Sequence, residues 1–148
     1  MDFSKWTFKV GSTVWQVRWQ PAIPQADLPD VYASADVCAV PSFHESFGLV
    51  ALEAMACGTA VVAADVGALS SLVLDGETGR LVGSHEPRAF AAALEELLDD
   101  PEGASRMGES ASTWASGFTW DRSVGETLDG YRSVCTAGSE RRPVAPCV

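Results

Sequence analysis

The sequence predicts an α/β protein built on a Rossmann-like, doubly wound parallel sheet. Two apolar runs without alternation, Val37–Val40 and Ala60–Ala64, are typical of strands covered on both faces. Segments with helical spacing or helix-boundary residues follow each run, and buried strands that alternate with helices favour a parallel sheet. A further short strand, Arg80–Val82, comes after a turn at residues 75–79. We therefore expect a sheet with helices on both sides.

The N-terminal half contains an alternating strand and a short helix ahead of the first buried strand. Side chains alternate from Val14 to Gln20, which favours a strand, and the proline-rich residues 21–24 end it. Asp27 can cap a short helix, whose first turn tolerates Pro29. Its apolar face is expected to consist of Leu28, Val31, Tyr32 and Ala35. Residues 1–13 show no clear period.

A helix over residues 47–57 joins the two buried strands. It is apolar or small almost all round, so it should be buried, and Gly58 has the position of a left-handed residue that ends a helix. A glycine-containing loop over residues 65–71 leads to a short helix that includes Leu72–Leu74.

Three helices are expected in the C-terminal part. Pro87 begins the first, which ends at residues 99–100, and Pro101 begins the second, which Gly117 stops. The third runs from residue 120 to residue 134. The apolar residues at helical spacing in these helices are Phe90, Leu94, Leu97 and Leu98, then Met107, Ala111 and Trp114, then Val124, Leu128 and Tyr131.

The composition fits one folded domain and excludes several classes of partner. Of the 148 residues, 47% are hydrophobic, too many for a disordered chain. Ten basic and twenty acidic residues give a formal net charge of −10, so nucleic acid and anionic membranes are not expected as partners. No apolar run approaches the roughly 18 residues of a membrane span, and the N-terminus lacks an apolar signal core. We therefore expect a cytoplasmic protein without a transmembrane segment.

Two carboxylates mark the segment that leads from the first buried strand into the buried helix. Glu45 and Glu53 have seven residues between them. Each has a structural alternative: Glu45 as a carboxylate at a helix start, and Glu53 as a member of an ion pair or a residue at the solvent edge. Together they fit a ligand with phosphates and hydroxyls, because first-turn N–H groups suit phosphates and Gly48 lets a ligand approach the backbone. The segment lies beyond the carboxyl end of a strand, where ligands of such sheets bind.

Several stretches resemble the signature of the retaining GT-B glycosyltransferases of family 4. They are Asp36–Ser42, Glu45–Val62, Asp75–Val82 and Phe118–Arg122, within a match that extends from about Trp15 to Arg132. Pro41-Ser42 and Glu45–Ala51 are similar in sequence to the inositol-phosphate N-acetylglucosaminyltransferases of actinobacteria. The resemblance implies an incomplete second domain of a GT-B fold. Its expected divisions are an atypical N-terminal segment, a nucleotide-sugar-binding domain and a disordered tail, over residues 1–14, 15–134 and 135–148.

The resemblance also implies a role for each matched residue. Glu45 would be catalytic and would hold hydroxyls of the donor sugar together with the backbone of Ser46, Phe47 and Gly48. The amides of Leu49 and Val50 would bind the diphosphate. Glu53 would bind the ribose, and Ile23 would border the nucleobase.

The implied reaction is transfer of a hexosyl or N-acetylhexosaminyl group from a UDP-linked sugar with retention, without a cofactor or metal. The four cysteines show no metal-site spacing, and His44 and His85 are isolated, which agrees with that expectation. The first GT-B domain, and the arginine and lysine that bind the diphosphate, have no counterpart here, so the chain is expected to be inactive alone. A GT-B N-terminal domain on another chain would be its partner. The alternatives are a non-catalytic sugar-nucleotide-binding or interaction module and a subunit of a split glycosyltransferase. Without the first domain, Trp120, Leu128 and Tyr131 are expected to be partly exposed.

Overall fold

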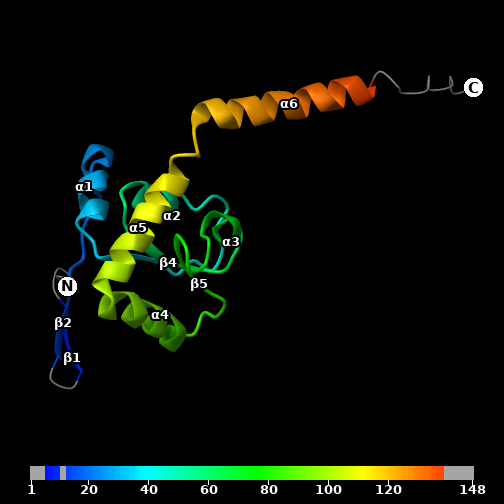
Figure 1. Cartoon of the computed structure of the whole chain (residues 1–148). Coiled ribbons are helices and arrows are strands. Elements are labelled where there is room, and N and C mark those ends of the chain that lie inside the picture. Colours follow the sequence, from blue (N-terminus) through cyan, green and yellow to red (C-terminus); the bar gives the residue numbers. More distant parts are fainter. Residues whose placement is uncertain (1–5, 11–12, 139–148) are drawn as a thin grey trace, which may run out of the picture.

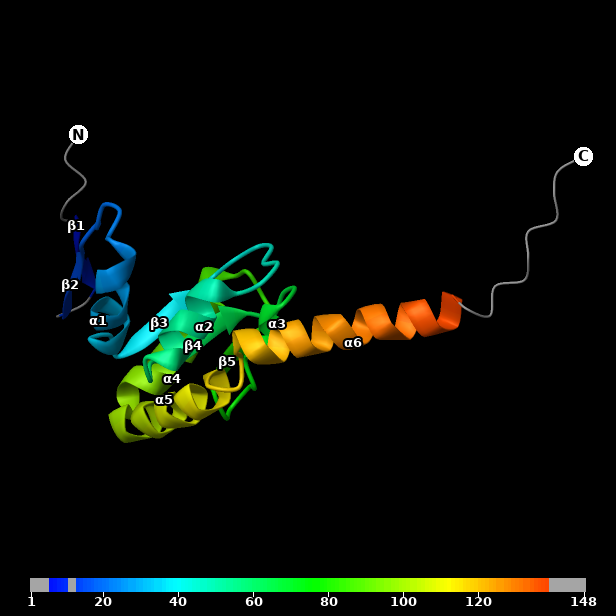
Figure 2. The same ribbon diagram turned by 90° about the horizontal axis from the view of Figure 1, so that it is seen from above.

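The computed structural model contains a three-layer α/β body, an N-terminal β-hairpin and a C-terminal helix that projects from the body (Figure 1). The structure describes residues 6–10 and 13–138. Figure 2 shows the same arrangement from above, with the hairpin and the projecting helix at opposite ends of the body.

The hairpin pairs β1 (Trp6–Val10) with β2 (Thr13–Val17) in antiparallel register. The sequence predicted no element before residue 14 and a strand that continues to residue 20. In the structure β2 ends at Val17, opposite Trp6, the first residue of β1. Residues 18–20 are not part of a strand, so their alternating pattern does not produce one.

The body is built on three parallel strands, β3 (Val37–Val40), β4 (Ala60–Ala64) and β5 (Gly79–Val82), in the order β3-β4-β5. All five residues of the central strand β4 are buried. Its side chains divide between two clusters, with Val61 and Ala63 in one and Ala60 and Val62 in the other. This confirms that residues 60–64 form a strand covered on both faces.

The edge strand β3 is less covered than the sequence predicted. Val40 is buried, Val37 and Cys38 are half-buried, and Ala39 is exposed. Val37 packs against the cluster beneath α4, whereas Ala39, two residues along on the same face, lies beyond it. The prediction of full cover on both faces is therefore wrong for this strand, because an edge strand receives only part of the helical layer.

Helices cover both faces of the sheet (Figure 1). The helix α4 (Pro87–Asp99) covers one face, and α2 (Leu49–Ala56) and α3 (Leu69–Leu72) cover the other. The helix α5 (Pro101–Ala115) contributes to both core clusters, with Ala104 in the cluster of α4 and with Ala111 and Ala115 in the cluster of α2. The short α1 (Leu28–Ala33), preceded by the 3₁₀ turn η1 (Gln25–Asp27), packs against α2. Gly58 ends α2 with a φ of 80°, as predicted.

The last helix, α6 (Trp120–Gly138), extends away from the body (Figures 1 and 2). Trp120, Leu128 and Tyr131 are 87%, 46% and 68% exposed, which confirms the exposure predicted from the sequence. The helix continues four residues beyond Val134, through part of the segment expected to be a disordered tail. The remainder of that predicted tail, 139–148, lies outside the described residues, as do residues 1–5 and 11–12 of the predicted N-terminal segment.

Candidate functional site

Three loops meet at the carboxyl edge of the sheet. In the β4–α3 loop, the N–H of Ala68 donates to the backbone oxygen of Glu45 over 3.1 Å, and a side chain at Gly67 would overlap that oxygen. The ring of Phe43 stacks on His85 of the β5–α4 loop, with 4.4 Å between the ring centroids. The β3–α2 loop is thus held from two sides, and His85, which the sequence analysis treated as isolated, is one of its supports.

The carboxylate of Glu45 lies against the backbone of its own loop. Its Oε1 accepts hydrogen bonds from the N–H of Gly48 at 3.1 Å and of Phe47 at 3.3 Å. These two N–H groups hold the pKa of the Glu45 carboxyl below its usual value, since they stabilise the charged form. The structure thus brings Glu45 together with two of the three amides assigned with it to the donor sugar. Ser46, the third, is exposed, and its backbone also contributes to the lowered pKa of Glu45.

Gly48 has a structural reason to be glycine besides access for a ligand. Its φ of 78° is left-handed, and this conformation delays the start of α2 to Leu49, two residues later than predicted. A β-carbon at Gly48 would also lie 3.0 Å from methyl groups of Leu69 and Leu72 on α3. Both constraints fix the position from which the first turn of α2 begins.

The first turn of α2 begins with two residues at the surface, and its first N–H groups have no acceptor within the helix. Leu52 is the first helix residue whose N–H bonds back along the chain, to the oxygen of Gly48 at 2.9 Å. The N–H groups of Leu49, Val50 and Ala51 precede it, where an α-helix offers no acceptor of its own. Leu49 and Val50 are 56% and 49% exposed, so an anion can approach this helix end.

Glu53 shares a helix face with Leu49 and Val50, which precede it by four and three residues. It is half-buried, and its Oε2 accepts a hydrogen bond from the hydroxyl of Tyr32 over 3.0 Å. The backbone oxygen of Tyr32 in turn accepts from the hydroxyl of Thr59 at 2.6 Å. Burial, together with the Glu53 carboxylate, raises the pKa of Tyr32 to about 12. Glu53 therefore has a protein partner on α1, but this partner is a neutral hydroxyl and not the cation of the ion pair considered from the sequence.

Tyr32 is the site residue that the sequence analysis missed. It was assigned to the apolar face of the short helix, together with Leu28, Val31 and Ala35. A partly buried tyrosine usually has a hydrogen-bond partner for its hydroxyl, and this is the signal that pointed toward a nearby acceptor.

The remaining predicted residue, Ile23, is half-buried in the irregular segment before η1. Its assignment to the nucleobase stays a prediction. In the part of the chain that the structure describes, no three His, Cys, Asp or Glu side chains gather in a way that could hold a metal ion. Within the same residues, no helix has the length and apolar character to cross a membrane.

Comparisons with known proteins identify relatives of this chain. Residues 15–114 match the family described as glycosyl transferases group 1. Over 138 residues the chain is 49% identical to D-inositol 3-phosphate glycosyltransferase of Kineococcus radiotolerans, covering 88% of this chain and 32% of that protein. The protein of the same name from Corynebacterium glutamicum is 53% identical over 119 residues, 80% of this chain and 28% of that one. The chain thus spans about a third or less of the length of these relatives.

Solved structures give the same result for the fold. Sucrose-phosphate synthase of Thermosynechococcus elongatus has a TM-score of 0.65 and 41% identity, over 72% of this chain and 27% of that one. Anabaena HepE in complex with UDP has a TM-score of 0.65 and 32% identity, over 72% of this chain and 30% of that one. The predicted fold class, a Rossmann-like α/β sheet from the second domain of a GT-B fold, is confirmed. The chain belongs to the group 1 glycosyl transferase family.

Proposed function

We propose that this chain is the donor-binding part of a retaining GT-B glycosyltransferase of family 4 that uses a UDP-linked sugar. Relatives at 45–54% identity are D-inositol 3-phosphate glycosyltransferases, which supports glycosyl transfer to a hydroxyl group. HepE, a structural neighbour, is known in complexes with UDP and with UDP-glucose, which supports a UDP-linked donor. The transferred group would be a hexosyl or N-acetylhexosaminyl unit.

The observation that carries this proposal is the shared face of α2. Leu49 and Val50 are exposed residues in the first turn, and their amides suit a diphosphate because the helix dipole favours negative charge there. Glu53 lies one turn further along the same face and suits the two ribose hydroxyls. A carboxylate has about four acceptor positions, so the hydrogen bond from Tyr32 leaves room for both hydroxyls. The order along the helix is then diphosphate at its start and ribose one turn on.

Glu45 lies in the loop before the first turn of α2, where it would bind hydroxyls of the donor sugar. In the structure its carboxylate accepts hydrogen bonds from the amides of Phe47 and Gly48. When a donor sugar binds, the carboxylate exchanges these amides for sugar hydroxyls, and the amides, with that of Ser46, become available to the sugar and the phosphate. This exchange gives Glu45 a role in the catalytic centre without making it a nucleophile.

Transfer breaks the bond between the anomeric carbon and the diphosphate oxygen and forms a bond from that carbon to an acceptor hydroxyl oxygen. The hydroxyl proton leaves with the diphosphate, and attack on the same face as departure gives retention. We place the acceptor site on a GT-B N-terminal domain outside the matched residues, supplied by another chain, so the 148-residue chain alone should bind donor but not transfer sugar. We expect no cofactor or metal in this reaction, and the cytoplasmic location also stays a prediction.

The test is calorimetric titration of the 148-residue chain with UDP and with UDP-N-acetylglucosamine. We expect weak binding of both, and a loss of at least about tenfold in affinity for Glu53→Ala, because hydrogen bonds to a charged group contribute about 1.5–3 kcal/mol. Tyr32→Phe keeps the carboxylate and should change the affinity by less than about threefold. Glu95→Ala on α4, an exposed carboxylate elsewhere, is the control.

Unchanged UDP affinity in Glu53→Ala would remove its ribose role. The absence of UDP binding at millimolar concentration would contradict the proposed donor class. Turnover by this chain without a partner would contradict the location of the acceptor site.

A further inference from the structure

The loop between β3 and α2 carries Glu45 but has little buried surface of its own. It runs over residues 41–48, between the last residue of β3 and the first residue of α2. Gly48 is its only buried residue. Because a loop with few buried contacts moves more easily than the elements beside it, the position of Glu45 depends on contacts from other parts of the chain.

Two neighbouring loops supply such contacts, at two different points. In the β4–α3 loop, the N–H of Ala68 donates to the backbone oxygen of Glu45 over 3.1 Å, and a β-carbon at Gly67 would overlap that oxygen. In the β5–α4 loop, the imidazole of His85 stacks on the ring of Phe43, with 4.4 Å between the ring centroids and 25° between the ring planes. The first contact fixes the backbone of Glu45 itself, and the second fixes the chain two residues before it.

The stack of His85 on Phe43 is not part of the hydrophobic core. Phe43 is 69% exposed, and His85 is exposed as well. Neither ring belongs to the two core clusters found among the described residues. Because the two rings come from different loops at the same edge of the sheet, their contact joins these loops and limits where the β3–α2 loop can lie.

We infer that His85 is a positioning residue for Glu45 and thereby determines how tightly the donor sugar binds. This role rests on the proposed function, since it requires Glu45 to bind hydroxyls of that sugar. His85 acts through Phe43 and need not touch the sugar. With the loop held at both points, the carboxylate is presented in one place before the ligand arrives, so less conformational freedom is lost on binding.

The two halves of a nucleotide sugar would then depend on different supports. The diphosphate and the ribose would be bound by Leu49, Val50 and Glu53, which belong to α2. That helix is held in the body by its own buried residues, which are members of a core cluster. Loss of the stack should therefore weaken the binding of the sugar and leave the binding of UDP nearly unchanged.

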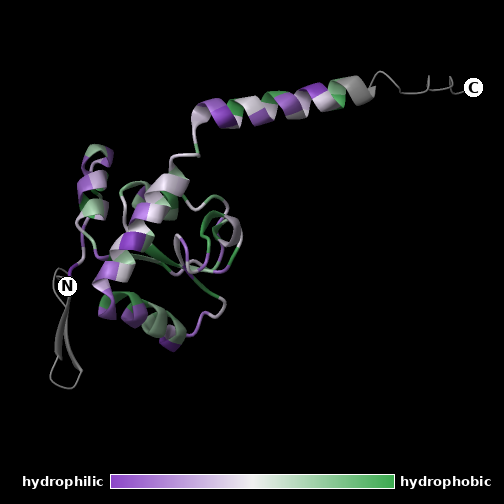
Figure 3. Ribbon diagram, viewed as in Figure 1, coloured by the Kyte–Doolittle hydropathy of each residue, from purple (hydrophilic) through white to green (hydrophobic). Residues whose placement is uncertain are grey.

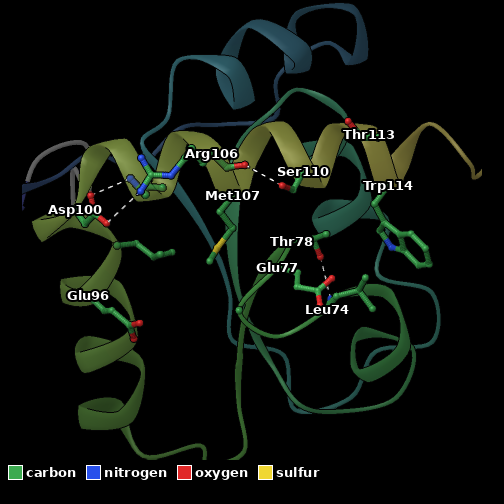
Figure 4. Close-up of a pocket in the computed structure, with 14 residues that line it drawn as sticks. Leu74, Glu77, Thr78, Glu96, Asp100, Arg106, Met107, Ser110, Thr113 and Trp114 are labelled. Carbon is green, nitrogen blue, oxygen red and sulfur yellow. Dashed lines mark hydrogen bonds and ion pairs between the residues drawn. The ribbon is translucent and has the colours of Figure 1, made fainter.

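A second ring contact in the body provides a matched control. Trp114 on α5 lines the cavity of about 750 Å³ between α4, α5 and the turn at residues 74–78 (Figure 4). The ring of Phe118, which is partly exposed, meets it edge to face, with 5.7 Å between the centroids. Neither residue belongs to the three loops around Glu45. Phe118→Ala therefore removes a ring contact of the body without altering those loops.

The binding test is calorimetric titration of the full 148-residue chain with UDP and with UDP-N-acetylglucosamine. His85→Ala should weaken the binding of UDP-N-acetylglucosamine by about three- to tenfold, the factor that one aromatic pair usually contributes, and that of UDP by less than about twofold. His85→Phe keeps a ring that can stack on Phe43 and should restore the original affinities. Phe118→Ala should leave both affinities within about twofold of those of the original chain.

A second measurement follows the loop without any ligand. The N–H groups of Phe47 and Gly48 bond to the Glu45 carboxylate, so their hydrogen exchange reports on its position. Their exchange should be at least about threefold faster in His85→Ala and return to the original rate in His85→Phe. Unchanged exchange in His85→Ala would overturn the positioning role, even if both nucleotides bind as proposed.

The sugar role of Glu45 has its own variant in the same titrations. Glu45→Ala should weaken UDP-N-acetylglucosamine at least as much as His85→Ala does. If Glu45→Ala leaves that affinity unchanged, the proposed role of Glu45 is wrong, and the role of His85 in sugar binding is wrong with it. If Glu45→Ala weakens the sugar nucleotide and His85→Ala does not, only the role of His85 is wrong. Equal effects of His85→Ala and Phe118→Ala would show a general loss of stability and would also overturn that role.

Discussion

The helices α2 and α6 contain similar kinds of apolar side chain and use them in opposite ways. In α2, an eight-residue helix, Ala51, Ala54 and Met55 are fully buried between the sheet and α5. In α6, nineteen residues long, the apolar residues stay exposed along the projecting helix, which Figure 3 shows as alternating colours. What decides the role of an apolar residue here is whether the topology supplies a surface to cover it.

The two helices therefore have different sources of stability. An isolated helix of eight residues is unstable in water, so α2 exists because of its tertiary contacts. The longer α6 depends on its own backbone and on pairs along its surface, such as Arg122 with Glu126 at 2.8 Å, each worth about 0.2–0.5 kcal/mol. It should unfold locally before the body does.

Truncation of a large side chain should separate these two helices most strongly. Met55→Ala removes a fully buried side chain and should lower the free energy of unfolding by about 3 kcal/mol, through lost burial and a cavity in the core. Leu128→Ala removes a side chain that is 46% exposed on α6 and should change it by less than about 0.5 kcal/mol. Urea unfolding followed by circular dichroism measures both. Equal losses would show that α6 is packed in solution.

Glycine-to-alanine substitutions give the next largest contrast between the body and α6. We expect a loss of stability in the body and a gain in α6. A β-carbon at Gly108 on α5 would overlap the carbonyl oxygen of Gly58 at the end of α2, so Gly108→Ala should cost about 2 kcal/mol despite the better helix propensity of alanine. At Gly125 on α6 there is open space, so Gly125→Ala should stabilise that helix by about 0.5–1 kcal/mol. Thermal melting of the helical signal checks both. A stabilised Gly108→Ala variant would show that α5 does not approach the end of α2 so closely.

The elements of the body were predictable where the sequence carries local boundary residues. Pro87 and Pro101 fix the first residues of α4 and α5, and Gly58 ends α2, as expected. The apolar run of β4 predicted a strand covered on both faces, because no polar residue interrupts it. In these cases the local signal and the tertiary environment agree.

The features that the sequence did not predict depend on neighbours distant in the chain. The exposure of Ala39 follows from its place on an edge strand, which a strand pattern does not reveal. The hydrogen bond from Tyr32 to Glu53 joins residues 21 positions apart. The candidate site was found from its motif, whereas the internal partners of its carboxylates required the fold.

The smallest expected effect concerns the two tyrosines, Tyr32 against α2 and Tyr131 on α6. Because the pKa of Tyr32 is raised to about 12 in the fold from its ordinary value of 10, folding favours the protonated hydroxyl. The stability from this group is fully present below about pH 10 and is lost as the pH rises toward 12. Tyr32→Phe should cost about 1 kcal/mol at pH 7, the usual value of one hydrogen bond, and the variant and the original chain should converge between pH 10 and 12.

Urea midpoints measured at pH 7, 9, 10 and 11 would follow this convergence on the basis of the linkage between protonation and folding. Tyr131→Phe removes a hydroxyl from a side chain that is 68% exposed, so it should leave both the midpoint and its dependence on pH as they are in the original chain. A difference between Tyr32→Phe and the original chain that stays constant up to pH 11 would mean that the Tyr32 hydroxyl is not bound to a carboxylate. In that case the α1–α2 contact would contribute to packing only, and Glu53 would keep all of its acceptor capacity for a ligand.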